Sequence, residues 1–161
     1  MKTIIVNQTS EALNEKNINQ MTQKVLSFLK AKRIRHKKLL SLGELTLVFL
    51  GSADMKKINF QFRKKNKPTD VLSFAPTDSD SIGELLFCCD VLKKQAREQK
   101  HSEGHEFLYM LIHGLLHLLG YDHELSLKEE KLMFNIQDQI FHELTESKIN
   151  LQYKNVNRNR T

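Results

Sequence analysis

The segment HGLLHLLGYDH, residues 113–123, decides how the rest of the chain is arranged, and its histidines stand at relative positions 0, 4 and 10. Four residues make about one helical turn, so His113 and His117 are expected to share one face of a helix. Gly120 is expected to end that helix, because glycine adopts the left-handed conformation at little steric cost. The chain can then bring His123 toward the other two. Three neutral imidazoles with an open fourth position make a catalytic zinc site, so the segment predicts a hydrolytic metal centre.

Apolar residues surround most of the helix that carries His113 and His117. This helix is expected to begin near Ser102, and its apolar positions are Phe107, Leu108, Leu111, Ile112, Leu115, Leu116, Leu118 and Leu119. A helix that is apolar around most of its circumference is usually buried. We therefore expect the metal-binding helix to lie in the core, with its two histidines away from bulk water.

The remaining hydrophobic patterns predict four strands and four further helices. Segments rich in β-branched and apolar residues predict strands at residues 2–8, 44–50, 69–74 and 82–89. Helical periodicity or capping residues predict helices at residues 17–32, 52–62, 90–100 and 127–144, with Ser52 and Asp90 as N-caps of the second and third. Strands come early and helices late, which indicates an α+β fold in which helices pack on a small sheet.

Length and composition indicate one soluble domain. The chain has 161 residues, 40% of them hydrophobic, and no apolar segment approaches the ~20 residues that span a bilayer. The N-terminus lacks the apolar core of a signal peptide, so we expect a cytoplasmic protein with no membrane partner. The adjacent Cys88 and Cys89 are expected to be reduced and packed. Residues 1–145 are expected to form the domain, and the polar, basic residues 146–161 a disordered tail.

Positive charge is concentrated in two clusters. The net charge is +6, and the clusters are residues 32–38 (KRIRHKK) and 63–68 (RKKNKP). Such clusters suit the phosphates of a nucleic acid, but each can equally be an ordinary solvated segment. For Arg63 the alternative is an ion pair, with Asp70 or Glu84 as the partner.

The histidine spacing equals that of the metzincin proteases, H-E-x-x-H-x-x-G-x-x-H. The glutamate that would act as general base after the first histidine is Gly114 here. Losing such a base costs roughly 100- to 10,000-fold in rate. Peptidase activity is therefore a weaker alternative. Asp122, beside the third histidine, is expected to shape the turn or to orient an imidazole.

Three blocks of sequence together resemble one known family. HGLLHLLGYDH looks like the signature of the YbeY endoribonucleases, the metal-dependent ribosomal RNA maturation factors of bacteria and organelles. The block RKKNKPTDVLSF, residues 63–74, resembles that family's R-x-K-x-x-P-T-D-V-L-S-F segment. GELLFC, residues 83–88, resembles its G-D-I-x-x-C strand, with Glu84 in place of the more usual aspartate. The resemblance covers about residues 45–144.

The resemblance implies a zincin-like α+β fold with a small mixed four-stranded sheet. In it, His113, His117 and His123 correspond to the metal ligands, and Arg63 to a functionally important arginine facing the metal cleft. The implied substrate is single-stranded RNA near the 3′ end of small-subunit ribosomal RNA, with a wider role in ribosome maturation and quality control. Small-subunit ribosomal proteins and a ribosome-associated GTPase are the implied partners.

The chemistry of the residues agrees with this reading. One zinc ion held by three neutral histidines lowers the pKa of its bound water to ~7, so hydroxide forms without a glutamate base; nickel or another divalent transition metal is an alternative. Arg63 can hold two phosphoryl oxygens, and Lys64, Lys65 and Lys67 can steer the RNA backbone. We therefore predict a metal-dependent, single-strand-specific endoribonuclease. The alternatives are a non-catalytic ribosome assembly factor with a structural metal and, more weakly, a metallopeptidase.

Overall fold

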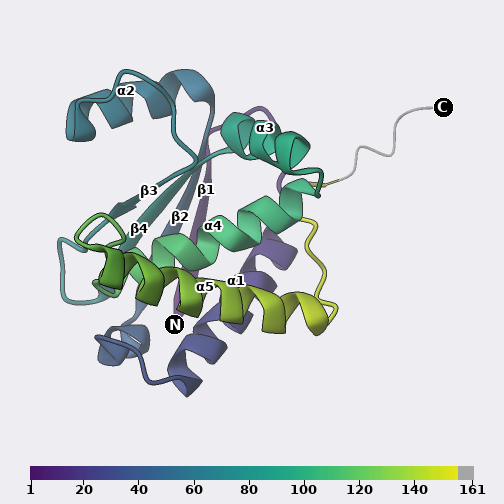
Figure 1. Ribbon diagram of the computed structural model, residues 1–161. Coiled ribbons are helices and arrows are strands. Elements are labelled where there is room, and N and C mark those ends of the chain that lie inside the picture. Colours follow the sequence, from purple (N-terminus) through teal and green to yellow (C-terminus); the bar gives the residue numbers. More distant parts are fainter. Residues whose placement is uncertain (156–161) are drawn as a thin grey trace.

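The computed structural model describes residues 1–155 and contains one four-stranded sheet (Figure 1). The strands lie in the order β1-β2-β4-β3; β1 pairs with β2 and β2 with β4 in parallel, whereas β3 and β4 are antiparallel. The predicted α+β class with a mixed four-stranded sheet is thus confirmed. The strands are β1 Lys2–Asn7, β2 Glu44–Leu50, β3 Val71–Phe74 and β4 Ser81–Cys88. The helices are α1 Glu15–Ala31, a 3-10 turn Lys37–Ser41, α2 Ser52–Arg63, α3 Cys89–Gln99, α4 Glu103–Leu118 and α5 Leu127–Glu146.

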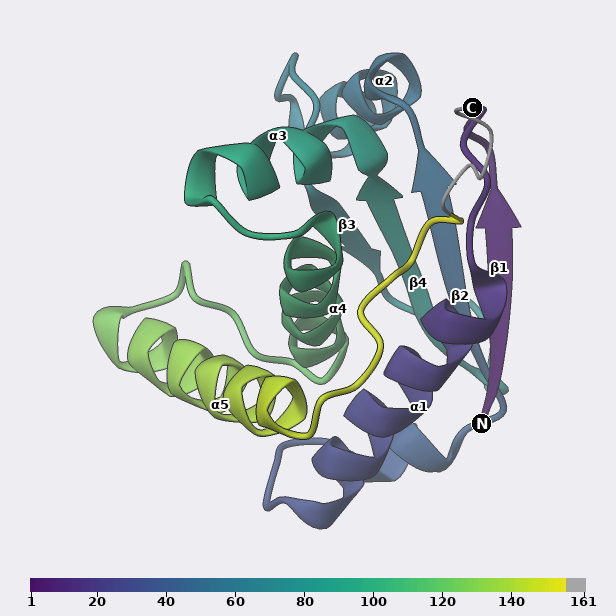
Figure 2. The same ribbon diagram turned by 90° about the vertical axis from the view of Figure 1, so that its right-hand side faces the viewer.

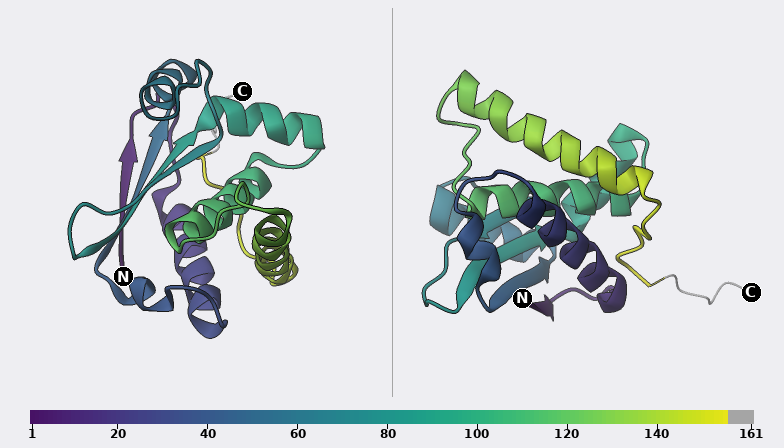
Figure 3. Two further views of the ribbon diagram at one scale, coloured as in Figure 1. Left: turned by 60° about the vertical axis from the view of Figure 1, so that its left-hand side comes forward. Right: turned by 90° about the horizontal axis from the view of Figure 1, so that it is seen from below.

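Side chains that alternate along the strands build two separate cores. Leu45, Leu47 and Phe49 of β2 belong to the large core on one face, whereas Leu50 belongs to a smaller one that contains Met55 of α2. This alternation follows from the period of two residues in a strand. Helices α1, α4 and α5 lie over the large-core face, and α2 lies on the other side (Figures 2 and 3).

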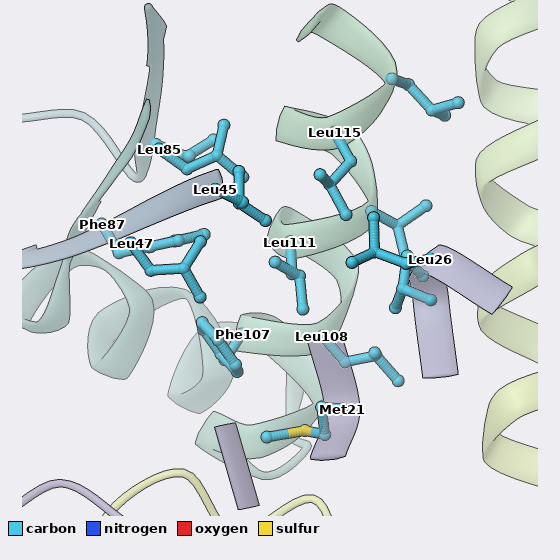
Figure 4. Close-up of a cluster of buried hydrophobic side chains, with 14 of the residues drawn as sticks. Met21, Leu26, Leu45, Leu47, Leu85, Phe87, Phe107, Leu108, Leu111 and Leu115 are labelled. Carbon is cyan, nitrogen blue, oxygen red and sulfur yellow. The ribbon is translucent and has the colours of Figure 1, made fainter. Parts of the chain in front are cut away.

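Helix α4 runs through the large core. Figure 4 shows Phe107, Leu111 and Leu115 of α4 among Leu45 and Leu85 of the sheet, and each of these side chains is 0% exposed. Full burial of one such side chain contributes about 1.5–3 kcal/mol. Nine of the sixteen residues of α4 are buried, so its position relative to the sheet is strongly fixed.

Two capping predictions need correction. Ser52 and Asp90 were expected to cap the helices that they begin, but α2 and α3 start at Ser52 and Cys89 with Gly51 and Cys88 as N-caps. The Asp90 carboxylate instead accepts a 2.8 Å hydrogen bond from the backbone N–H of Ser52. It therefore satisfies a free N–H at the start of the other helix, where a negative charge is also favoured.

The expected disorder of residues 146–161 is wrong for the part that the structure describes. Glu146 ends α5, and residues 147–155 run back along the domain, where Leu13 and Lys154 form an antiparallel bridge. The Tyr153 ring is 1% exposed and stacks on Phe107 at 4.9 Å between centroids. Lys154 Nζ lies 2.7 Å from carboxylate oxygens of both Glu11 and Glu103. Residues 156–161 lie outside the described residues.

The polar composition of residues 147–155 gave no sign that Tyr153 would be buried or that Lys154 would be paired with two carboxylates.

Cys88 and Cys89 are free and buried, as expected. None of the helices within residues 1–155 is both long and apolar enough to cross a membrane.

Tyr153→Ala is expected to lower the free energy of unfolding by about 3–5 kcal/mol, because it empties a buried aromatic site. Tyr153→Phe is the matched control: it keeps the ring and removes the hydroxyl, which donates to Glu103 at 3.3 Å, so a loss of about 1 kcal/mol is expected. Chemical denaturation of both variants measures the difference. Equal, small effects would mean that residues 147–155 do not pack in solution.

Candidate metal centre

The three histidines converge at the carboxyl-terminal end of α4. One ring nitrogen from each of His113, His117 and His123 lies within 4.8 Å of the other two, and the Nε2 atoms of His113 and His117 are 3.1 Å apart. Zinc–nitrogen bonds of about 2.0–2.1 Å in tetrahedral geometry require nitrogens about 3.3 Å apart. The three histidines would therefore hold a single divalent ion.

The turn after α4 brings His123 back to the helix. Gly120 has φ +85°, its N–H donates to the His117 carbonyl at 3.0 Å, and the N–H of Tyr121 donates to the Leu116 carbonyl at 3.1 Å. These two bonds define the Schellman motif, in which a left-handed residue ends the helix. A Cβ at Gly120 would also approach His36 Cδ2 to 3.1 Å. Glycine is therefore favoured here by backbone conformation and by space.

Gln137 of α5 orients the first histidine, a role that the sequence analysis missed. Its Oε1 accepts from His113 Nδ1 at 2.9 Å, and its Nε2 donates to the Tyr109 carbonyl at 3.3 Å. A proton fixed on Nδ1 leaves the Nε2 lone pair free for a metal. Gln137 is 0% exposed and lies between Met133 and Ile140 on the inner face of α5. The sequence did contain a sign of this role, because Gln137 is a polar residue at a position where the helical period of α5 calls for an apolar one.

Burial keeps two of the imidazoles neutral. It lowers the pKa of His113, opposed by the Gln137 hydrogen bond, and it lowers the pKa of His117 to about 4, assisted by repulsion from His113 and His123. Only a neutral imidazole offers a lone pair to a metal. The apoprotein thus presents these two ligands in the state that a metal requires at neutral pH.

The position of the missing protease glutamate is in close contact with the sheet. A Cβ at Gly114 would lie 2.8 Å from Leu85 Cδ2 of β4, and the Gly114 carbonyl accepts from Ser73 Oγ of β3 at 3.3 Å. Leu85 is 0% exposed. A larger residue would have to displace this buried leucine, so packing favours glycine independently of the chemistry.

The histidines open into a cavity of about 670 Å³, which we call the metal cleft. Arg63, at the end of α2, lines it together with Lys65, whereas Lys64 and Lys67 do not. Arg63 Nη2 lies 3.5 Å from Glu124 Oε1, so its ion-pair partner is Glu124 and not Asp70 or Glu84. The fold therefore places Arg63 and Lys65 in the same cavity as the three histidines.

Asp122 has the expected turn-forming role. Its Oδ1 accepts from the backbone N–H of Glu124 at 2.9 Å. This side chain therefore fixes the loop on which His123 stands.

The basic cluster of residues 32–38 is partly neutralised within the molecule. Arg35 makes two hydrogen bonds to Glu129, at 2.7 and 2.9 Å, and its guanidinium lies 5.0 Å from the centroid of the Tyr121 ring. Lys32 Nζ lies 3.2 Å from Glu143. These contacts tie the segment that follows α1 to α5, and they favour a structural role for both cations over phosphate binding.

Comparison with known proteins gives one consistent answer. The sequence model of a family described as Endoribonuclease YbeY matches residues 3–145. The Endoribonuclease YbeY of Bdellovibrio bacteriovorus is 48% identical over 141 residues, which cover 88% of this chain and 93% of that protein. The Endoribonuclease YbeY of Petrotoga mobilis is 39% identical over 147 residues, which cover 89% of this chain and 96% of that protein. The solution structure of TM1509 from Thermotoga maritima superimposes with a TM-score of 0.64 at 26% identity, covering 99% of this chain and 100% of that one.

Gln137→Leu is expected to weaken metal affinity about 10- to 100-fold, because the His113 ring loses the acceptor that fixes its tautomer. Gln137→Glu keeps an acceptor at that place and is the matched control, with a smaller loss. Competition titration against a chromophoric chelator measures both. Equal affinity in Gln137→Leu and the wild type would show that the hydrogen bond does not support metal binding.

The metal-free protein is expected to lose stability as the pH falls from about 6.5 to about 4. The reason is that an unfolded histidine takes up its proton near pH 6.5, whereas folded His117 resists protonation until about pH 4. The unfolded state therefore binds more protons in this window. Urea denaturation at several pH values measures the slope, which is expected to be shallower in His117→Gln; an unchanged slope would contradict the assignment.

Proposed function

Because this chain belongs to the Endoribonuclease YbeY family, we propose that it hydrolyses phosphodiester bonds within single-stranded RNA at the metal cleft. The single observation that supports this most strongly is that one cavity joins His113, His117 and His123 to Arg63 and Lys65. A metal centre and two cations at the same cleft are the groups that phosphoryl transfer needs.

Each group has a distinct task in the proposed reaction. A divalent ion held by the three imidazoles supplies Lewis-acid chemistry when it is bound. Arg63 holds two oxygens of the scissile phosphate and stabilises the negative charge that develops on them. Lys65 contacts a neighbouring phosphate of the backbone. Gln137 keeps the proton of His113 on Nδ1, so that the Nε2 lone pair would be free to bind the ion.

In the free protein, the Glu124 carboxylate occupies the side of Arg63 that would bind the substrate phosphate. Its carboxylate pairs with Arg63, and both side chains are well exposed at 60% and 40%. An exposed ion pair of this kind contributes at most about 1 kcal/mol. An incoming phosphate, which Arg63 can bind through two hydrogen bonds, therefore displaces it at small cost.

The proposal includes the finer features that the family resemblance implies. We assign one zinc ion to the centre and a zincin-like fold to residues 1–145, supported by the histidine spacing and by the family match over residues 3–145. We further propose a cytoplasmic enzyme acting on small-subunit ribosomal RNA near its 3′ end and in ribosome quality control, with small-subunit proteins and a GTPase as partners. Restoration of ribosomal RNA 3′ ends in a bacterium that lacks its own Endoribonuclease YbeY tests this extension.

Arg63→Ala is expected to lower kcat for cleavage of a single-stranded RNA about 100- to 1,000-fold, as when one donor to a developing oxyanion is removed. Its metal content and unfolding midpoint are expected to stay at wild-type values. His113→Ala is expected to lose both metal and activity. Full activity in both purified variants would identify the cleavage as a contaminating nuclease and overturn the proposal.

The same variants separate the enzyme from a non-catalytic assembly factor. If the protein works by assembly alone, Arg63→Ala restores ribosome maturation as well as the wild type does. If it works by cleavage, Arg63→Ala fails although it folds and binds metal. Hydrolysis of a peptide library by the wild type, without cleavage of RNA, would favour the metallopeptidase alternative.

Lys65→Ala is expected to weaken RNA binding and to lower the salt dependence of log Kd by about one unit, because one phosphate contact is lost. Lys64→Ala is the matched control, since Lys64 does not line the metal cleft and its Nζ lies 3.5 Å from the Gln61 carbonyl. Fluorescence anisotropy at three salt concentrations measures both slopes. If log Kd depended on salt concentration equally in the two variants, Lys65 would not contact the RNA.

A further inference from the structure

A second cavity adjoins the metal cleft along α4. It has a volume of about 540 Å³ and shares Asp70 and Met110 with the metal cleft. Its other lining residues come from three helices or their ends: Gln95, Glu98, Gln99, His101, Glu106, Tyr109 and Phe141. Figure 2 shows α3 and α5 on opposite sides of α4 at this part of the molecule. We call this cavity the side pocket.

The two cavities differ in charge. Each cavity is lined by three carboxylates, one of them the shared Asp70, but the metal cleft also contains Arg63 and Lys65, whereas the side pocket is lined, within residues 1–155, by no lysine or arginine. A phosphate would be repelled from the side pocket. A neutral group that donates hydrogen bonds is favoured there, because carboxylates are strong acceptors.

Two aromatic side chains, Tyr109 and Phe141, line the side pocket. The rings of Tyr109 and Phe141 meet edge to face, with centroids 5.2 Å apart, and the Tyr109 hydroxyl donates to Asp138 at 2.8 Å. His101 is held by a hydrogen bond to Glu106. Such fixed rings offer flat apolar surface to a nucleobase, and base stacking is the main means by which proteins hold single-stranded RNA.

We propose that the side pocket binds the base of a nucleotide next to the scissile phosphate, and that it favours bases with an exocyclic amino group. This inference rests on the proposed function, because it requires an RNA strand in the metal cleft. In this arrangement the phosphates of the RNA contact Arg63 and Lys65 in the metal cleft. The neighbouring base extends past Asp70 and Met110, which line both cavities, into the side pocket. Glu98 is the acceptor best placed for selectivity, because it is exposed and its ion pair to Lys94 is 3.9 Å long. Glu106 is already bonded to His101, and Asp70 accepts from Val71 and Gln95.

Oligocytidine and oligouridine test the inference directly, because the two bases differ at C4, where cytosine carries an amino donor and uracil a carbonyl acceptor. Binding of fluorescein-labelled hexamers is measured by anisotropy with the full-length protein after a chelator has removed metal, and gels confirm that the RNA stays intact. Cleavage is measured separately with the metal-loaded protein. The wild type is expected to bind oligocytidine about fivefold more tightly than oligouridine. Glu98→Ala is expected to abolish this preference. Glu15→Ala removes the same charge at an exposed position of α1 and is expected to keep the preference.

Removal of an aromatic ring tests the stacking. Phe141→Leu is expected to weaken binding of both hexamers about fivefold. Phe28→Leu is the matched control, because Phe28 is likewise partly buried against the large core but lies on α1, and binding is expected to be unchanged. Unfolding midpoints of both variants show whether a loss of binding reflects loss of fold.

The outcomes separate this inference from the proposed function. RNA cleavage with equal binding of the two hexamers, or with a cytosine preference that survives in Glu98→Ala, overturns the side-pocket inference and leaves the endoribonuclease standing. A preference that depends on Glu98 without any cleavage supports the side pocket and overturns the hydrolysis. No binding of either hexamer overturns both.

Discussion

The hydrogen bond from the Tyr121 backbone N–H to the Leu116 carbonyl is the contact on which the rest of the site depends. It ends α4 in a Schellman motif and turns the chain, so that His123 meets two histidines already aligned by the helix. Because α4 is buried against the sheet, that alignment is held by the whole large core. The candidate metal centre therefore lies at the end of a core helix, whose packing holds His113 and His117 in place.

The parts of the structure that were predictable are those determined by neighbours in sequence. Strand β2 was placed at residues 44–50, as the structure has it, and α4 was expected to begin near Ser102, which the structure shows to be its N-cap, because periodicity acts within a few residues. The convergence of the histidines was predictable for the same reason: spacing of 4 along a helix and a glycine turn are local geometry. The 3-10 turn at Lys37–Ser41 carried no comparable pattern and was not predicted.

The missed features are pairings between residues far apart in the chain. Asp90 accepts a hydrogen bond from Ser52, which is 38 residues away in the sequence. Tyr153 donates one to Glu103, which is 50 residues away. Gln137 acts on His113 from another helix, 24 residues later. Whether a polar residue finds such a partner depends on the tertiary fold, and composition alone cannot show it. Tyr153 illustrates the difference: one buried ring with about 3–5 kcal/mol of packing outweighs the polarity of its neighbours.

Gly114 connects the fold to the chemistry. The sequence suggested that glycine stands there because the proposed reaction needs no carboxylate after the first ligand. The structure adds a reason that is independent of catalysis, since the Gly114 position lies against Leu85 and its carbonyl is bonded to Ser73. Close packing of α4 on the sheet therefore disfavours a glutamate, and the charged groups that the cleft needs must come from other segments. Arg63 comes from the end of α2 and Glu124 from the loop after His123. The same close packing that orients the histidines thus divides the site among segments that meet only in the folded protein.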